Sequence, residues 1–162
     1  MRDKLNVATA SRRTVLAGIG ASLGAGLGSL IVVRPAGATP QAMAAAIRQI
    51  TGGAEAKPGR IKLDVPPLVE NGNSVTTTVR VESPLTPTDF VKAIHVLTEK
   101  NPQPNVISVK MSPRAGKAEF QTRIRLADSQ QVVAICEMSD GSFWSDKVDV
   151  ILTLSACLED PV

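Results

Sequence analysis

The sequence is poor in aromatic residues and in histidine. Its 162 residues include no tyrosine, one tryptophan (Trp144), three phenylalanines and one histidine (His95). A surface that stacks bases or sugar rings needs several aromatic side chains, so such a surface is not expected. One histidine and two cysteines, without the usual ligand spacing, also provide no zinc cluster. We predict no metal and no other cofactor.

Motifs that carry catalytic chemistry are also missing. The sequence contains no glycine-rich phosphate loop, no Ser-His-Asp order and no obvious pair of catalytic carboxylates. His95 lies in an apolar run and is interpreted as a packed strand residue, although a Cys–His nucleophile pair stays open. We therefore predict a carrier or binding subunit with no catalytic residue.

The net charge of +3 belongs to the first 38 residues, which hold five basic residues and one acidic residue. Without them, 13 basic and 14 acidic residues leave a net charge of −1. A nucleic-acid partner or an anionic membrane surface is therefore not expected for the remaining chain.

Residues 1–38 are interpreted as a twin-arginine signal peptide. Ser11-Arg12-Arg13 opens the export motif, residues 14–33 carry no charge, and Ala36-Gly37-Ala38 provides small residues for cleavage after Ala38. The uncharged stretch is long enough for a membrane anchor, but its five glycines favour a signal. We predict export by the twin-arginine route to the periplasm, with no stable membrane association after cleavage.

A short N-terminal helix is predicted over residues 39–56. Pro40 suits a first helical turn, apolar residues recur at helical spacing from Met43 to Ile50, and Gly52-Gly53 ends the run.

From residue 60 onward, short apolar runs alternate with Pro-, Gly- and Asn-rich turns. No alternation of strands and helices is present, so we predict an all-β, immunoglobulin-like antiparallel β-sandwich over residues 60–154. About seven strands are expected, at residues 60–65, 75–82, 90–98, 106–111, 118–126, 131–138 and 143–154.

Four local features receive structural interpretations. Residues 70–72 (ENG) are expected to turn, with Asn71 or Gly72 in a left-handed conformation, and Asp140-Gly141 is expected to form a hairpin turn. Arg123 and Arg125 share a strand face that we interpret as solvated rather than as a partner or anion surface. The Phe143-Trp144 pair is expected to pack against the sandwich or a subunit interface.

The two cysteines differ in their surroundings. Cys136 lies in a continuous apolar run and is expected to be buried as a small hydrophobic residue. Cys157 follows the last predicted strand, shares the parity of its polar residues and stands five residues before the end of the sequence. Residues 155–162 are therefore interpreted as a cysteine arm. A Cys136–Cys157 disulfide stays open as an alternative.

An exposed thiol can carry a group covalently, because the thiolate is nucleophilic and its sulfur products are reversible. Glu159 and Asp160 follow Cys157 closely and should raise the pKa of its thiol. A protein partner would therefore have to provide positive charge around the sulfur.

Several segments, in order, resemble the SoxY family of sulfur carriers from thiosulfate oxidation. They are residues 69–72 (VENG), 101–104 (NPQP), 122–127 (TRIRLA) and 139–144 (SDGSFW). The resemblance implies an immunoglobulin-like sandwich that pairs with a SoxZ-like subunit and serves periplasmic sulfur-oxidation enzymes. It also implies that a cysteine near the C-terminus holds sulfur intermediates, and Cys157 is the matching position.

The arm departs from the family pattern Gly-Gly-Cys-Gly-Gly. It reads Ser155-Ala156-Cys157-Leu158-Glu159, so the glycines that let such an arm enter a narrow channel are absent. The sequence is therefore similar to a divergent SoxY-related branch. Two functions stay open: a covalent sulfur carrier, or a non-catalytic scaffold or binding subunit of another pathway, for example one with quinoprotein dehydrogenases.

Overall fold

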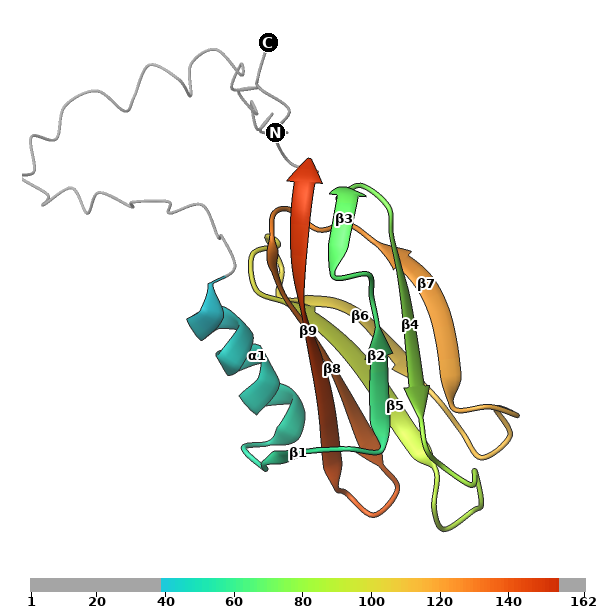
Figure 1. The fold of residues 1–162 in the computed structure, drawn as a ribbon. Coiled ribbons are helices and arrows are strands. Elements are labelled where there is room, and N and C mark those ends of the chain that lie inside the picture. The colour runs from blue at the N-terminus through green and yellow to red at the C-terminus, as the bar shows by residue number, and fades with distance from the viewer. Residues whose placement is uncertain (1–38, 155–162) are drawn as a thin grey trace, which may run out of the picture. The chain divides into compact units, whose positions relative to one another are not determined.

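The computed structural model describes residues 39–154, which form one helix and nine strands (Figure 1). The predicted signal peptide and the predicted cysteine arm, including Cys157, lie outside the described residues. The elements are α1 Pro40–Thr51, β1 Ala56–Pro58, β2 Ile61–Asp64, β3 Leu68–Asn71, β4 Val75–Val81, β5 Val91–Thr98, β6 Asn105–Lys110, β7 Glu119–Ile124, β8 Gln130–Met138 and β9 Phe143–Leu154.

Helix α1 begins and ends where its capping residues stand. The Thr39 hydroxyl accepts a hydrogen bond from the Ala42 N–H at 3.1 Å, and Pro40 occupies the first turn. Gly52 adopts a left-handed conformation with φ 63°, and the Gly53 N–H donates to the Arg48 carbonyl. The predicted helix is confirmed, but it is shorter than the expected residues 39–56.

The strands form two sheets. The larger has the strand order β1-β9-β8-β5-β6, with β3 also paired to β9, and the smaller has the order β2-β4-β7. Neighbouring long strands run antiparallel, and the sheets face each other as a sandwich. All seven predicted strands are present, and their boundaries agree with the prediction to within two residues.

The prediction missed two strands and their direction. Strands β1 and β3 are three and four residues long, and both pair in parallel with β9. Each sits beside prolines that read as strand breakers in the sequence. Their register partners in β9 lie 87 residues further along the chain for β1 (Ala56 and Phe143) and 83 for β3 (Leu68 and Ile151), so local sequence patterns carry no sign of this pairing.

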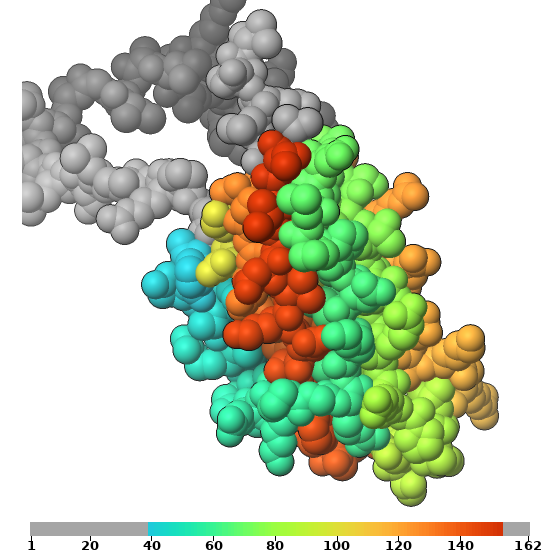
Figure 2. Space-filling model, viewed as in Figure 1, coloured from blue at the N-terminus to red at the C-terminus, as the bar shows by residue number. Residues whose placement is uncertain are grey.

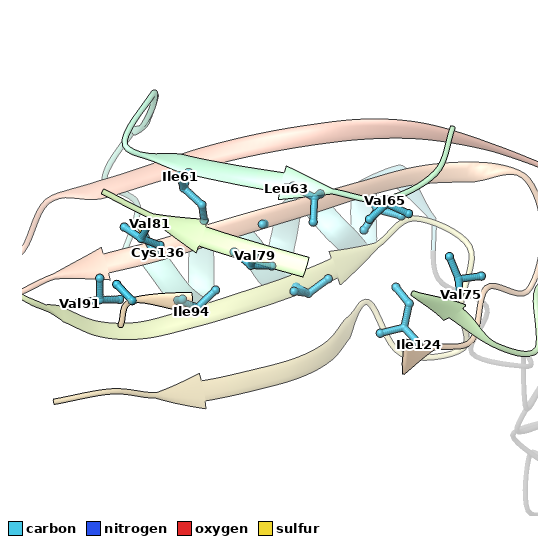
Figure 3. Close-up of a cluster of buried hydrophobic side chains, with 14 of the residues drawn as sticks. Ile61, Leu63, Val65, Val75, Val79, Val81, Val91, Ile94, Ile124 and Cys136 are labelled. Atoms are coloured by element: carbon cyan, nitrogen blue, oxygen red, sulfur yellow. The ribbon is translucent and has the colours of Figure 1, made fainter. Parts of the chain in front are cut away.

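The main core lies between the two sheets and is built from aliphatic side chains (Figure 3). Its fully buried residues come from both sheets and from the connections between strands; they include Leu63, Val79, Ile94, Val96, Leu126 and Val132. Phe120 and Trp144 pack only at its margin. The scarcity of aromatic residues is therefore met by close packing of branched side chains.

A second, smaller cluster lies on the outer face of the larger sheet. Met43, on α1, packs there with Leu97, Val133 and Ile135. Phe143 adds a ring to this cluster, whereas its neighbour Trp144 points toward the main core. The predicted packing role of Phe143 and Trp144 within the sandwich is confirmed.

One side of the sandwich is closed by a side chain of β9. Asp146 accepts a hydrogen bond from the Leu63 N–H of β2 at 2.9 Å, and Lys62 lies 4.0 Å from the same carboxylate. On the opposite side the sheets end with β6 and β7, which pair with no further described strand.

Two turns were predicted, and one needs a correction. Gly141 has φ 81° in the tight β8–β9 hairpin, as expected for residues 140–141. At residues 70–72 the chain also turns, and the Asn71 side chain accepts a hydrogen bond from the Asn73 N–H at 2.9 Å. However, neither Asn71 nor Gly72 has a positive φ, so the expected left-handed residue is wrong. The side-chain bond of Asn71 stabilises this turn without one.

In the described residues no helix is both long and apolar enough to cross a membrane.

Candidate site at the end of strand β9

The end of β9 is held from both sides, although it extends past β8. The last β8 partner is Gln130, opposite Val150. Beyond it, the Ser129 hydroxyl accepts a hydrogen bond from the Leu152 N–H at 2.8 Å and lies 3.4 Å from the Leu152 carbonyl. A single serine therefore continues the β8 side of the strand.

Strand β3 supports the other side of β9 (Figure 2). The Ile151 N–H donates to the Pro67 carbonyl at 2.8 Å, and the Thr153 hydroxyl donates to the Glu70 carbonyl at 3.1 Å. The backbone is thus fixed as far as Thr153, four residues before Cys157. Strand β3, which the sequence analysis did not predict, therefore anchors the end of β9, which is the base of the predicted arm.

The predicted alternation along β9 is confirmed as far as Thr153. Val150 is buried and Leu152 is half-buried, whereas Asp149, Ile151 and Thr153 are exposed. Ile151 is apolar at a position where the pattern predicts a polar residue. Its side chain nevertheless points outward as the alternation requires, because it is 60% exposed. The prediction that Cys157 continues the exposed parity concerns a residue outside this range and stays a prediction.

An exposed apolar pair lies at the base of the predicted arm. Leu68 of β3 is 62% exposed and stands in register with Ile151 of β9. Register partners on neighbouring strands project their side chains to the same face of the sheet, so these two exposed side chains lie on one face. The sequence analysis did not predict this pair. The sequence did contain one sign of it, because Ile151 is an apolar residue among the polar residues that alternate along this strand.

The other cysteine is buried, as predicted. The side chain of Cys136 is 0% exposed in the main core, and Cys136 makes no disulfide among the described residues. Burial raises the pKa of its thiol from an ordinary 9.0 to about 11, and a backbone hydrogen bond at Trp144 offsets part of this effect. At neutral pH Cys136 is therefore a neutral thiol without access to reagents.

This raised pKa predicts a loss of stability at alkaline pH. The unfolded chain releases the thiol proton first, so the contribution of Cys136 is complete below pH 9 and is lost between about pH 9 and pH 11. Urea unfolding at pH 8 and pH 10.5 should show that the wild type loses about 2 kcal/mol more than Cys136→Ala. Equal losses in both proteins would contradict the raised pKa.

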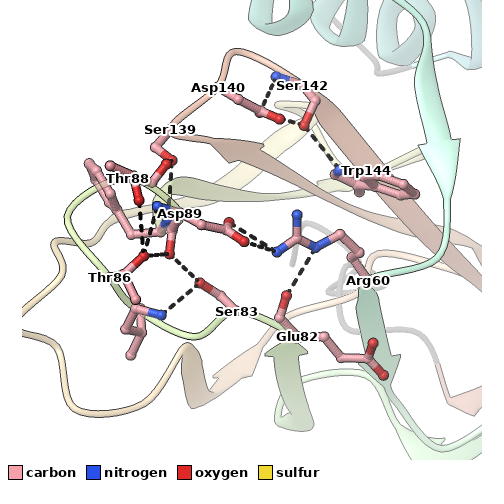
Figure 4. A network of polar contacts seen from close by, with 12 residues as sticks. Arg60, Glu82, Ser83, Thr86, Thr88, Asp89, Ser139, Asp140, Ser142 and Trp144 are labelled. Carbon is pink, nitrogen blue, oxygen red and sulfur yellow. Dashed lines mark hydrogen bonds and ion pairs between the residues drawn. The ribbon is translucent and has the colours of Figure 1, made fainter.

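A polar network lies at the opposite end of β9 (Figure 4). Arg60 donates from Nη2 to both carboxylate oxygens of Asp89 at 3.0 and 3.1 Å, and from Nε to the Glu82 carbonyl at 3.1 Å. Its guanidinium carbon lies 6.0 Å from the centre of the Trp144 ring. Arg60, in the β1–β2 connection, thus links the β4–β5 connection with strand β9, in spite of a left-handed φ of 51°. The sequence analysis did not predict this role of Arg60. The network contacts β9 at Trp144, which lies ten residues before Leu154, the last residue of the strand.

His95, Arg123 and Arg125 were also singled out from the sequence. The His95 Nδ1 lies 2.8 Å from the Ser108 hydroxyl, and burial lowers the pKa of the imidazole while Glu137 opposes the shift. Arg123 and Arg125 are exposed on β7 and just beyond it. Across residues 39–154, no three His, Cys, Asp or Glu side chains form a group that could hold a metal ion.

Two packed sheets, antiparallel long strands and a buried aliphatic interior define an immunoglobulin-like β-sandwich protein. Within that class, comparison of the sequence with known families identifies one family. The model of the family described as "Sulfur oxidation protein SoxY" matches residues 47–157, more than half of the chain, so this protein belongs to the SoxY family. The predicted family and fold are confirmed, and membership fits a carrier or binding subunit rather than a catalyst.

Solved structures share the sandwich. The sulfur carrier protein SoxY from Chlorobium limicola f thiosulfatophilum is 24% identical with a TM-score of 0.58, over 68% of this chain and 91% of that chain. A superoxide reductase (neelaredoxin) from Ignicoccus hospitalis is 15% identical with a TM-score of 0.52, over 71% of this chain and 94% of that chain. At these identities the likeness shows the fold alone. No curated protein matches the sequence.

Proposed function

We propose that this protein is a periplasmic carrier of sulfur oxidation that holds sulfur intermediates covalently on Cys157. The observation that carries the proposal is the family match, which runs from residue 47 and ends at Cys157 itself. The carrier role fits a chain whose only other thiol, Cys136, is sealed in the core.

The anchored end of β9 supports a thiol presented at the end of the sandwich. Cys157 is the third residue after Leu154, and a chain of three residues spans at most about 11 Å. Hydrogen bonds hold β9 as far as Thr153, so a partner enzyme would meet a short arm on a fixed base. A fixed base lowers the entropy lost when the arm is positioned in a partner's site.

The length of β9 argues against the alternative of an internal disulfide. Cys136 stands in register with Trp144, ten residues before Leu154, which corresponds to about 33 Å of strand. Three residues cannot return over that distance, since bridged cysteines need Cα atoms within about 7 Å.

The chemistry of loading requires a second protein. When the Cys157 thiolate joins the outer sulfur of thiosulfate, one S–S bond forms and two electrons leave the pair of sulfur anions. A partner oxidoreductase must accept these electrons. The carrier itself needs no catalytic residue, and the group is released when another nucleophile attacks one of the sulfur atoms.

Export and pairing complete the proposal. The Ser11-Arg12-Arg13 motif supports twin-arginine export, and family membership supports a heterodimer with a SoxZ-like subunit and work with sulfur-oxidation enzymes. Glu159 and Asp160 disfavour the thiolate form of Cys157 by charge repulsion. Positively charged groups of a partner subunit would offset this repulsion.

Intact mass tests the carrier function. The mature protein, purified from the periplasm without reductant, is expected to show a mass increment that maps to Cys157 and disappears on treatment with a thiol. The protein should also gain such an increment after incubation with thiosulfate and the enzymes of its pathway. Failure to find an adduct under all of these conditions would refute the covalent carrier.

A second candidate is a non-catalytic scaffold or binding subunit of another pathway, for example one with quinoprotein dehydrogenases. The replacement of the arm glycines by Ala156, Leu158 and Glu159 favours it, because these side chains obstruct a narrow channel. This candidate predicts two unmodified thiols and no change in growth on sulfur compounds when Cys157 is replaced.

A further inference from the structure

Strands β6 and β7 leave one side of the sandwich open. Each is the last strand of its sheet within residues 39–154. Asn101, in the β5–β6 connection, donates to the Arg125 carbonyl at 2.8 Å and accepts from the Ala127 N–H at 2.9 Å. The end of β7 therefore lies against the side of the molecule where β6 ends the other sheet. We call residues 105–125 the β6–β7 edge.

The free side of β7 exposes backbone groups. The Val81 N–H donates to the Ala118 carbonyl at 2.8 Å, so alternate residues from Ala118 onward point their backbone groups toward β4. The backbone N–H and C=O groups of Gln121 and Arg123 therefore point away from the sheet. Such groups form a template for another strand.

The β6–β7 edge is strongly basic. Lys110, Arg114, Lys117, Arg123 and Arg125 lie on it, and none makes an ion pair among the described residues. Its only acidic residue is Glu119, which lies 3.4 Å from Arg80 of β4. In contrast, five of the eight basic residues on other parts of the described chain contact a carboxylate: Arg60, Lys62, Arg80, Lys92 and Lys100.

Apolar side chains and a hollow accompany these charges. Val106, Ile107, Met111 and Phe120 pack against the main core but stay half-buried, because no strand covers them on this side. A hollow of about 300 Å³ opens on the smaller sheet, lined by Thr76, Gln121, Thr122 and Arg123. Its lining contains no carboxylate, so an acidic side chain would meet only hydroxyl, amide and guanidinium groups.

We propose that the β6–β7 edge is a docking surface for a protein partner that adds a β-strand along β7 and places carboxylates opposite Arg123 and Arg125. Strand addition satisfies the free backbone groups, and alternate side chains give the contact its specificity. The basic edge selects an acidic strand and repels a basic one. This inference rests on the proposed need for a partner subunit, but not on covalent chemistry at Cys157.

A binding measurement with a purified SoxZ-like subunit tests this surface. We expect Arg123→Glu with Arg125→Glu to weaken binding at low salt at least tenfold. The matched control, Lys57→Glu with Lys147→Glu, makes the same change at exposed cations that also lack an ion pair among the described residues, and it should stay within about threefold of the wild type. On binding, hydrogen exchange of the wild type should slow at the Gln121 and Arg123 amides.

Three results would overturn the inference. One is equal binding by the edge variant and the wild type, with unchanged exchange along β7, which leaves the carrier function intact. Another is that the wild type does not bind the subunit at all. A third is that β7 becomes protected only when the wild type forms a homodimer. If the double glutamate variant does not fold, Arg123→Gln with Arg125→Gln and the exchange data on the wild type decide the question. The mass of the Cys157 adduct is a separate readout.

Discussion

Replacing Cys157 with serine is expected to abolish the thiol-sensitive mass increment completely. Serine keeps the size and polarity of the side chain but removes the only atom that can form a reversible bond to sulfur. Because residue 157 lies beyond the anchored end of β9, the free energy of unfolding should change by less than about 0.5 kcal/mol. Intact mass after incubation with thiosulfate and the pathway's enzymes measures the first effect, and urea unfolding measures the second.

The matched control is Cys136→Ala, which removes the other thiol. This variant should keep the full mass increment, because Cys136 is buried and burial raises the pKa of its thiol to about 11. If the Cys157 variant still gains the increment while the Cys136 variant loses it, the assignment of the carrier residue is wrong. If both variants grow like the wild type on sulfur compounds and carry no adduct, the scaffold function gains support.

Truncating Ile94 to alanine is expected to lower the free energy of unfolding by about 2–5 kcal/mol. Ile94 is 0% exposed in the main core, between register partners on β6 and β8. The loss combines the transfer of apolar atoms from water with a cavity that branched neighbours on rigid strands cannot fill. Urea unfolding of the mature protein, with an unchanged dependence on urea concentration, measures it.

Ile151→Ala makes the same chemical change on the surface. Ile151 is 60% exposed on β9, so its truncation should cost less than about 1 kcal/mol. A loss as large as that of Ile94→Ala would show that the exposed pair of Leu68 and Ile151 is covered in solution. A loss below 1 kcal/mol in the Ile94 variant would contradict the position of the main core.

Local patterns predicted most elements because each depends on neighbours in sequence. The alternation in β4 places Val75, Thr77 and Val79 inside, as expected, since successive side chains of a strand point to opposite faces. Gly52 ends α1 because glycine reaches the left-handed conformation without strain. Cys136 was predicted to be buried because its whole segment is apolar.

Features that depend on distant contacts could not be predicted in this way. Strands β1 and β3 exist only because β9 offers them an edge, and Arg60 becomes a link only when Asp89 and Trp144 come close. The short segment of β3 contains nothing that distinguishes it from a loop. Its role in anchoring the base of the arm is therefore a property of the folded sheet.

The sequence by itself determined the class of fold, the SoxY family and the contrast between a buried and a terminal cysteine. These conclusions depend on the composition, on the spacing of apolar residues and on the order of short motifs. All three can be read along the chain without knowing which distant segments pair. Only the tertiary structure decided that β9 is anchored as far as Thr153, that Leu68 and Ile151 meet at its end, and that β6 and β7 leave a basic edge open. Register and strand order arise from pairing between segments that are distant in the sequence. The free energy that stabilises this pairing comes from burying the apolar faces of all the strands together, so no single segment reveals it.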